Sequence, residues 1–310
     1  MKTPGEREIV ERIRQQMAGA TAVSDDVVVG IGDDAAVLKQ EGKYYLLLTA
    51  DMLVEGVHFK FPAISFRELG HRALAVNLSD IAAMGGIPAY CLVSMGIRDG
   101  ITPGDIDAFY EGMAELAGAH EVRIVGGDTN YSPSGLILNI CVTGRVEPGC
   151  LCKRNGAVPG DSVFVTGQLG AGAMYLKRGR YFPPVPRVKE ARAIVKAVKV
   201  NAMIDISDGL GRDLHNVASS SGVGAVIESK ALPVFPGADM AQATGGGEDY
   251  ELLFTADARV GRDLPRIIED RTGTPVTRIG EIVRQGVSIR NPDGALVPLP
   301  STGYDHFMSR

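Results

Sequence analysis

Six short acidic segments are spread along the chain, and most of them adjoin an apolar run. They are Gly-Ile-Gly-Asp-Asp at 30–34, Thr-Ala-Asp at 49–51, Asn-Leu-Ser-Asp at 77–80, Gly-Gly-Asp-Thr at 126–129, Asp-Ile-Ser-Asp-Gly at 205–209 and Gly-Gly-Glu-Asp-Tyr at 246–250. A carboxylate beside a buried segment is costly to desolvate unless a cation or several hydrogen-bond donors meet it. The glycines let a backbone come close to a ligand. Together the segments predict carboxylates that converge on divalent metal ions and phosphate.

Asp80 carries the strongest single signal for a metal ligand. It lies in the stretch 66–84, which the pattern predicts to be a helix that is apolar on almost all of its faces. Aspartate has a poor helix propensity, and the sequence offers it no obvious basic partner. Two carboxylates about 4 Å apart repel by about 4 kcal/mol at an effective dielectric of about 20, so several such pairs need a cation between them. We therefore expect Asp80 to enter the core and to bind a metal ion.

The other aspartates have local explanations that the sequence leaves open. Asp34 could belong to a turn, Asp51 ends a predicted strand, and Asp128 follows two glycines that fit a plain turn equally well. Asp208 could cap the helix predicted to begin at 209. Asp205 points from a predicted strand and has no such explanation.

Three more residues have side chains suited to a ligand but weak local signals. Arg154 lies in a turn-rich segment, where it is either solvated or placed to capture phosphate. His58, between Val57 and Phe59, is more often a packed residue than a functional one in such a setting. Glu248 follows three glycines and fits a turn before a strand.

Familiar nucleotide and hydrolase motifs are missing from the sequence. There is no Gly-x-x-x-x-Gly-Lys-Ser/Thr loop, no kinase His-Arg-Asp set and no Gly-x-Ser-x-Gly elbow. The Gly-x-x-Gly-x-Gly run at 167–172 is rejected as a dinucleotide fingerprint, because several prolines precede the acid that should follow it. No residue stands out as a general base. An enzyme of this sequence that used ATP would therefore hold it through metal ions on carboxylates.

The pattern predicts alternating helices and strands in two halves. In the first half it predicts a helix near the start, strands at 27–31 and 45–48, a helix at 66–84, a strand at 89–97, a helix at 103–119, a strand ending at 125 and another at 135–145. Residues 147–160 are rich in turn formers, which places a domain boundary between 1–146 and 147–310. Helices and strands alternate again after this boundary.

Composition indicates a folded protein and argues against two classes of partner. The chain has 310 residues, 45% of them hydrophobic and 22% charged, with a net charge of −5. No stretch gathers basic and aromatic residues as a nucleic-acid surface would, and no apolar run approaches the roughly 20 residues of a membrane span. We expect no nucleic acid or membrane partner, a cytoplasmic location, and reduced thiols at the four cysteines.

In these motifs the chain resembles the thiamine-monophosphate kinase family, whose superfamily also contains aminoimidazole ribonucleotide synthetase and selenophosphate synthetase. The matching segments, in order, are Gly-Ile-Gly-Asp-Asp-Ala-Ala-Val at 30–37, Asp-Met-Leu-Val-Glu-Gly-Val-His-Phe at 51–59, Ala-Leu-Ala-Val-Asn-Leu-Ser-Asp-Ile-Ala-Ala-Met-Gly at 73–85, Gly-Gly-Asp-Thr at 126–129, Ile-Ser-Asp-Gly-Leu at 206–210, Gly-Gly-Glu-Asp-Tyr-Glu at 246–251 and Gly-Tyr-Asp-His-Phe at 303–307. Each segment alone is a weak signal, but their combination is specific.

The resemblance implies a two-domain α+β fold. An N-terminal α+β domain (1–146) would contain a mixed sheet that pairs with its twin in a homodimer, and a C-terminal α/β domain (147–310) would close over nucleotide and substrate. It also implies a reaction in which ATP, with several Mg²⁺ ions, phosphorylates thiamine monophosphate to thiamine diphosphate. A phosphate monoester is already a nucleophile, so direct in-line transfer needs no strong general base.

Carried over by position, the resemblance also implies roles for individual residues. The implied Mg²⁺ ligands are Asp34, Thr49, Asp51, Asp80, Asp128, Asp205 and Asp208; the implied ATP contacts are Gly127, Asp128, Arg154 and Ser207; the implied contacts to thiamine monophosphate are His58, Glu248 and Tyr304. Ala50 is a departure, because the family usually has a hydroxyl residue before the metal-binding aspartate. Alanine is harmless there if the ligand is a backbone carbonyl, and one metal site is in doubt if it is a hydroxyl.

Two other functions remain open from the sequence. Aminoimidazole ribonucleotide synthetase is the nearest enzymatic alternative, although the segments around His58 and Glu248 disfavour it. The chain could also be a nucleotide- or metal-binding module without catalysis, against which the retention of every acidic position argues. Selenophosphate synthetase is disfavoured, because no cysteine precedes Cys91.

Overall fold

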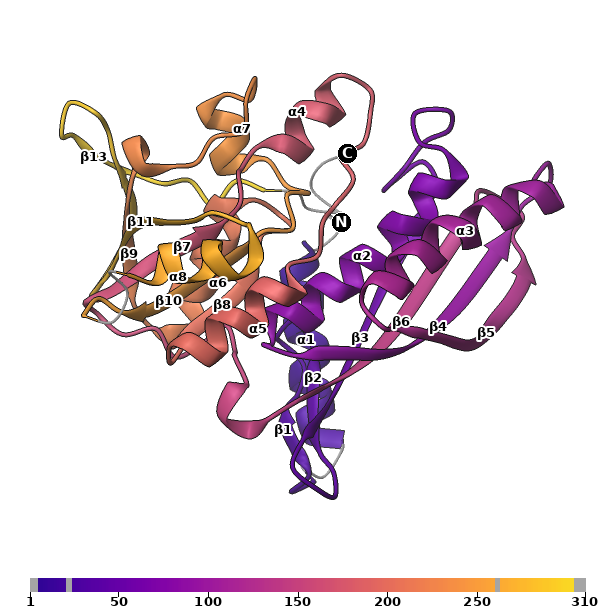
Figure 1. Cartoon of the computed structure of the whole chain (residues 1–310), viewed down its shortest axis with the longest axis horizontal. Coiled ribbons are helices and arrows are strands. Elements are labelled where there is room, and N and C mark those ends of the chain that lie inside the picture. Colours follow the sequence, from indigo (N-terminus) through magenta and orange to yellow (C-terminus); the bar gives the residue numbers. More distant parts are fainter. Residues whose placement is uncertain (1–4, 21–23, 260–262, 304–310) are drawn as a thin grey trace.

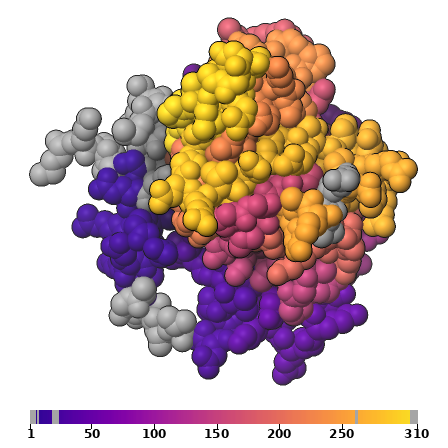
Figure 2. All heavy atoms as spheres, turned by 90° about the vertical axis from the view of Figure 1, so that its left-hand side faces the viewer, coloured from indigo at the N-terminus to yellow at the C-terminus, as the bar shows by residue number. Residues whose placement is uncertain are grey.

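The computed structural model describes residues 5–20, 24–259 and 263–303. Two β-sheets lie on either side of a long central helix, α2 (Phe66–Ala83), as Figure 1 shows. Figure 2 shows a face built mainly from the C-terminal half, with parts of the N-terminal half along its lower edge. No helix in the described residues is both long and apolar enough to span a membrane.

The N-terminal half forms a six-stranded mixed sheet in the order β1-β2-β3-β6-β4-β5. Its strands are β1 (Val27–Val29), β2 (Ala36–Lys39), β3 (Tyr45–Val54), β4 (Ile87–Ile97), β5 (Arg123–Tyr131) and β6 (Ile137–Val146), and its helices are α1 (Glu6–Ala20), α2 (Phe66–Ala83) and α3 (Pro103–Ala119). β4 and β5 run parallel, and the other neighbouring strands run antiparallel.

Helix α2 begins at a well-formed cap and is buried along most of its length. The side chain of Ser65 accepts a hydrogen bond from Glu68 N, and Glu68 bonds back to the Ser65 backbone, which completes a capping box. Gly70 lets α2 approach α3 closely, because a Cβ atom there would lie 1.9 Å from Phe109 O. The sequence therefore fixes both the start of α2 and its contact with α3.

The C-terminal half forms a seven-stranded mixed sheet in the order β13-β12-β9-β11-β7-β10-β8. Its strands are β7 (Asp161–Thr166), β8 (Ala202–Asp205), β9 (Gly224–Glu228), β10 (Leu252–Asp257), β11 (Val276–Val283), β12 (Val287–Arg290) and β13 (Leu296–Pro298). Its helices are α4 (Ala171–Lys177), α5 (Val188–Ala197), α6 (Leu210–Ser221), α7 (Met240–Gly245) and α8 (Leu264–Thr272), with short 3₁₀ turns at Pro148–Cys150 and Ser229–Ala231. The predicted two-part α+β fold with a mixed N-terminal sheet is confirmed.

Two predicted strand ends were wrong, and both errors concern acidic segments. β3 continues through Asp51 to Val54, and β5 continues through Gly126 and Gly127 to Tyr131. The glycine pair looks like a turn in the sequence, but a Cβ atom on Gly127 would lie 1.7 Å from Val93 O. Gly127 therefore permits a close strand pairing, and the glycine pair does not end the strand.

One hydrophobic core joins the two halves. It contains Leu78 and Ile81 of α2, Ile194 of α5, and Phe164 and Phe254 of the second sheet. The rings of Phe164 and Phe254 stack with their centroids 5.1 Å apart. One face of the second sheet and the N-terminal helices thus bury the same apolar surface.

Candidate functional site

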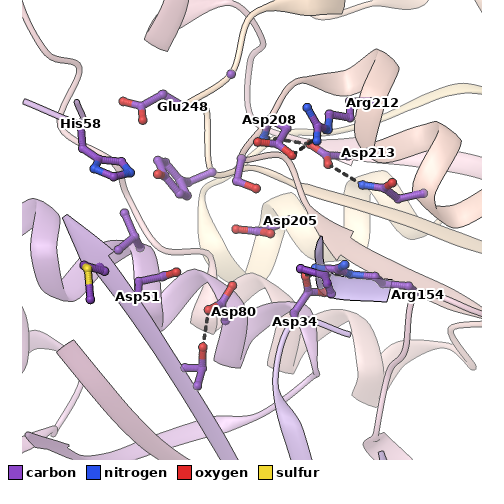
Figure 3. A pocket seen from close by; sticks show the side chains of 18 of the residues that line it. Asp34, Asp51, His58, Asp80, Arg154, Asp205, Asp208, Arg212, Asp213 and Glu248 are labelled. Atoms are coloured by element: carbon purple, nitrogen blue, oxygen red, sulfur yellow. Dashed lines mark hydrogen bonds and ion pairs between the residues drawn. The ribbon is translucent and has the colours of Figure 1, made fainter. Parts of the chain in front are cut away.

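A cavity of about 890 Å³ lies between the two halves. Residues of α1, β3, α2, β8, α6 and the turn 246–250 line it. Figure 3 shows acidic side chains at its centre, His58 and Glu248 on one side, and Asp208, Arg212 and Asp213 on another. Most of the predicted site residues meet here although they come from segments far apart in the sequence.

Three carboxylates form the acidic centre, which we define as Asp34, Asp80 and Asp205. One carboxylate oxygen from each lies within 4.8 Å of the others. Asp34 follows β1 and the turn at Gly32, Asp80 projects from α2, and Asp205 is the last residue of β8. The local reading of Asp34 as a turn residue is compatible with this position, since Asp34 N donates to Asp33 Oδ1.

Burial makes the charges of the acidic centre expensive. It raises the pKa of the Asp205 carboxyl from 3.8 to about 8, and the negative charge of Asp34 adds to this shift. Burial, together with the charges of Asp51 and Asp205, raises the pKa of Asp80 well above its ordinary value. Burial and the charge of Asp34 raise the pKa of Asp51 to about 6. A divalent cation would relieve the repulsion among these groups.

Hydroxyl groups orient two of the carboxylates. Thr49 Oγ1 donates to Asp80 Oδ2 at 2.5 Å, and Ser79 Oγ donates to Asp205 Oδ2 at 2.6 Å. Thr49 and Asp51 lie on the same face of β3 because side chains alternate along a strand. For the same reason the Ala50 side chain points away from them, so the residue that departs from the family pattern does not replace a hydroxyl aimed at the acidic centre.

Arg154 holds one oxygen of Asp34 and leaves the other available. Its Nε donates to Asp34 Oδ1 at 3.1 Å, its Nη2 forms an ion pair with the same oxygen, and its backbone N donates to Asp33. Asp34 Oδ2 is buried and has no hydrogen-bond partner among the described residues. Oxygen donors are what Mg²⁺ prefers, so this donor set fits a magnesium ion.

The segment just before α6 contributes Ser207 and Asp208, both of which line the cavity. Asp208 pairs with Arg212, with 3.1 Å between the Asp208 oxygen and Arg212 Nε. The expectation that Asp208 could cap this helix is wrong, since the cap residue is Gly209 and no side chain caps it there. Instead Asp213 accepts from Asp208 N and Gly209 N at 3.2 and 3.1 Å.

Asp213 was not predicted from the sequence, yet it is buried and lines the cavity. Burial, with the charges of Asp208 and Asp205, raises its pKa well above the ordinary value. Its position in the first turn of a predicted helix, directly after an acidic segment, was the available signal. Asp213 fixes the turn that presents Ser207 and Asp208.

The cavity extends into a second region, the His58–Glu248 lobe, lined by Val57, His58, Leu176, Tyr181, Glu248 and Tyr250. Val54 N donates to His58 Nδ1 at 2.9 Å, so Nδ1 is the acceptor and the ring proton is on Nε2. Glu248 forms an ion pair with Arg72 of α2. This lobe therefore brings an imidazole, a carboxylate and aromatic surface together at the cavity.

Gly127 and Asp128 are not brought to the acidic centre within this chain. Through the register, Asp51 pairs with Ile140, Ile140 with Val93, and Val93 with Gly127. This path crosses three strand spacings of about 4.8 Å each. Asp128 also pairs with Ser94, which lies on the same sheet face as Met52, the face turned away from α2. Asp128 is therefore on the opposite face of the sheet from Asp51. Tyr304 lies outside the described residues.

Comparisons with known proteins give the chain a family. The model of the AIR synthase related protein N-terminal domain matches residues 32–146, and that of the C-terminal domain matches residues 158–290. Thiamine-monophosphate kinase of Bacillus subtilis is 35% identical, with 91% of this chain and 94% of that protein covered.

Solved structures agree with this result. AaThiL complexed with AMPPCP and TMP is 30% identical with a TM-score of 0.82, covering 97% of each chain. Thiamine-monophosphate kinase from Stenotrophomonas maltophilia K279a is 34% identical with a TM-score of 0.75, covering 94% of this chain and 98% of that one. The identity over nearly the whole length, together with the acidic centre and its two flanking regions, shows that the chain belongs to the thiamine-monophosphate kinase family.

Proposed function

We propose that this protein transfers the γ-phosphoryl group of ATP to thiamine monophosphate, giving thiamine diphosphate and ADP. The observation that carries the proposal is an acidic centre placed between two regions of one cavity, so that two anionic substrates can meet over it. The related AaThiL, which covers 97% of this chain, was captured with AMPPCP and TMP together.

In this proposal Asp34, Asp80 and Asp205 hold Mg²⁺, with Thr49, Asp51 and Asp208 completing the oxygen ligands of several ions. Mg²⁺ supplies charge that screens the repulsion between the two phosphates and keeps them in line. The buried Oδ2 of Asp34, which has no hydrogen-bond partner in the described part of the chain, supports this assignment.

The chain's own groups bind and orient the substrates. Arg154 and Ser207 lie at the cavity wall next to the acidic centre, where they suit the phosphates of ATP. His58 and the Glu248 carboxylate lie on the same side of the cavity, where they suit the other substrate, thiamine monophosphate (Figure 3). The phosphate monoester acts as nucleophile, so the transfer proceeds directly and without a phosphorylated protein intermediate.

A homodimer would explain the placement of Asp128. The sheet face opposite α2 exposes large apolar side chains, including Met52 (54%), Leu92 (45%) and Tyr90 (49%). Single exposed apolar residues are normal on a protein surface, but several large ones on the same sheet face fit an interface with a second copy. In that arrangement the Gly127–Asp128 segment acts in the nucleotide site across the interface, since within one chain it lies on the far face of the sheet.

Subunit mixing tests this arrangement. Asp80→Asn and Asp128→Asn homodimers are each expected to be inactive, and partial activity should return after they are dissociated and reassembled together. No recovery, with mixed dimers verified by mass, would place both residues in the same subunit's site. The variant Leu92→Asp should be monomeric by sedimentation and inactive.

The function itself is tested by ADP release from ATP and Mg²⁺ with and without thiamine monophosphate, with Asp80→Asn as control. Acceptor-dependent ADP and thiamine diphosphate as product, both lost in the control, are expected. Turnover only with formylglycinamidine ribonucleotide would favour the aminoimidazole ribonucleotide synthetase alternative, and no turnover with either would favour a binding module. The cytoplasmic location, the absence of a nucleic-acid partner and the boundary at 146/147 stay predictions.

A further inference from the structure

Arg72 is a buried cation that the proposed mechanism does not yet use. It lies in the middle of α2 and is 2% exposed. Its Nη2 donates to Glu248 Oε2, while Nε and Nη1 are buried and have no hydrogen-bond partner among the described residues. Its guanidinium lies over the Tyr181 ring, 5.5 Å from the ring centroid. Arg72 therefore contacts two residues of the His58–Glu248 lobe, although it does not itself line the cavity.

The backbone that carries Glu248 is held in an unusual conformation. Glu248 and Tyr250 have φ angles of 74° and 52°, a region that residues other than glycine rarely adopt. Glu248 N donates to Ser207 O at 2.8 Å, and Tyr250 N donates to Ile206 O at 2.9 Å. The segment that connects β8 to α6 thus holds the backbone of this turn through bonds that do not involve Arg72.

Neighbouring groups close the turn from another side. The carboxylate of Asp249 accepts from Gly170 N and Gly172 N at 2.7 and 3.0 Å. A Cβ atom on Gly172 would lie 2.5 Å from Gly247 O, so α4 packs directly on the turn. The backbone is determined by these contacts, whereas the Glu248 side chain remains 25% exposed to the cavity and has Arg72 as its ion-pair partner.

We propose that Arg72 is a positioning residue for thiamine monophosphate, which acts by holding the Glu248 carboxylate in the His58–Glu248 lobe. The ion pair joins α2 of the N-terminal half to the turn 246–250 of the C-terminal half. The pair balances the buried charge of Arg72 while leaving the Glu248 carboxylate partly exposed to the cavity. This inference rests on the proposed function.

A double-mutant cycle tests the inference through the acceptor's KM. Arg72→Met is expected to raise the KM for thiamine monophosphate roughly tenfold to a hundredfold, because a charge-assisted hydrogen bond is lost, while the KM for ATP stays unchanged. In the Glu248→Gln background the same substitution should have little further effect, since Arg72 acts through Glu248. Independent, additive effects of the two substitutions would overturn the proposal.

Arg192→Met is the matched control. Arg192 also forms a partly buried ion pair, with 2.8 Å to Glu147, and donates to Gly85 O of the N-terminal half at 2.5 Å, but it lies away from the cavity. It should lower stability without changing the acceptor's KM. If Arg72→Met does not fold, Arg72→Lys keeps the charge and should give a smaller rise in the same KM; an unchanged KM in that variant would equally overturn the inference. A wild-type protein without thiamine-monophosphate turnover would instead refute the proposed function.

Discussion

Two buried clusters of charge in this molecule differ in how the chain balances them. In the acidic centre, three carboxylates lie close together. Hydroxyl groups donate to Asp80 and Asp205, and Arg154 pairs with Asp34. In the second cluster, Glu251 is 4% exposed and accepts from Arg187 Nε at 2.6 Å and from Thr166 Oγ1 at 2.6 Å.

The second cluster is closed within the chain. Arg187 binds Glu251 through two nitrogens and lies 3.7 Å from Glu190, which in turn accepts from Thr274 Oγ1 at 2.5 Å. Its donors and acceptors satisfy one another, and it lies away from the cavity. A buried carboxylate whose charge is balanced by its own chain therefore contributes to the fold, whereas a group of carboxylates whose charge a cation must balance is suited to chemistry.

Asp80→Asn should have the largest effect of the substitutions that test the contrast between the two clusters. We expect activity to fall by roughly a thousandfold or more, because several kcal/mol of charge stabilisation in the transition state depend on the metal ligands. Without metal, the Asp80→Asn variant should melt at a higher temperature than metal-free wild type, because a repulsive charge is removed. Mg²⁺ should raise the Tm of the variant less than it raises the Tm of wild type. Steady-state ADP release and thermal melts measure both; a variant with normal activity would remove Asp80 from the metal site.

Arg187→Met should show the opposite behaviour. Removing one partner of a largely buried pair leaves Glu251 uncompensated and should lower the free energy of unfolding by about 3–5 kcal/mol. Activity per folded molecule should stay close to wild type. Urea unfolding followed by circular dichroism, with activity assayed below the transition, gives both quantities. A large loss of kcat at unchanged stability would contradict the structural role of this cluster.

The two clusters should also respond differently to pH. Asp51 and Asp205 have folded pKa values of about 6 and about 8 against an ordinary 3.8, so the folded state binds more protons than the unfolded state in this interval. Their contribution to stability is complete below 3.8 and is lost as the pH rises through 6 and 8. The metal-free protein should therefore lose stability as the pH rises across this window, measured by thermal melts.

Magnesium should reverse that trend. It binds the ionised carboxylates, so its stabilising effect grows as the pH rises. The Asp205→Asn variant should show a flatter pH dependence without Mg²⁺ than wild type does. An unaltered slope in that variant would mean that other groups cause the pH dependence.

The smallest expected effects come from a matched pair of threonine substitutions. Thr49→Val removes a hydrogen bond to Asp80, and Thr274→Val removes one to Glu190; each bond is 2.5 Å long. Each should cost about 1–3 kcal/mol, the first mainly as a weaker apparent affinity for Mg²⁺ and the second mainly as lower stability. Mg²⁺ titrations of activity measure the apparent affinity, and urea unfolding measures the stability. If both variants changed these two quantities to the same extent, the proposed difference between the two clusters would be wrong.

Two of the three residues of the acidic centre stood out in the sequence because each breaks a local rule, whereas Asp34 also fitted an ordinary turn. Asp80 interrupts an apolar helix, and Asp205 ends a buried strand without a capping role. Arg72 is also a charged residue in this apolar helix, about two turns before Asp80. It was overlooked because arginine is a good helix former, so its presence in a helix is not unusual. Its partner, Glu248, is 176 residues away.

Other features depend on pairing between distant segments and could not be read locally. Asp128 sits in a strand because Gly127 tolerates contact with β4, and that pairing is invisible in the segment itself. Asp213 is a different case, because its bonds to the Asp208 and Gly209 amides are local, whereas its burial at the cavity comes only from the fold and does not show in the sequence.

The core shared by the two sheets has a consequence for how the protein unfolds. Because α2 packs against side chains of both halves, separating them would expose Leu78, Ile81 and Phe164 to water at once. The two halves should therefore melt in a single cooperative transition, with the slowest amide hydrogen exchange in α2. A chain cut between residues 146 and 147 would expose the apolar surface that each part contributes to this shared core, although the C-terminal part keeps a second cluster of its own around Val165, Ile204 and Leu253. Neither half can therefore be exchanged without a matching apolar face on the other.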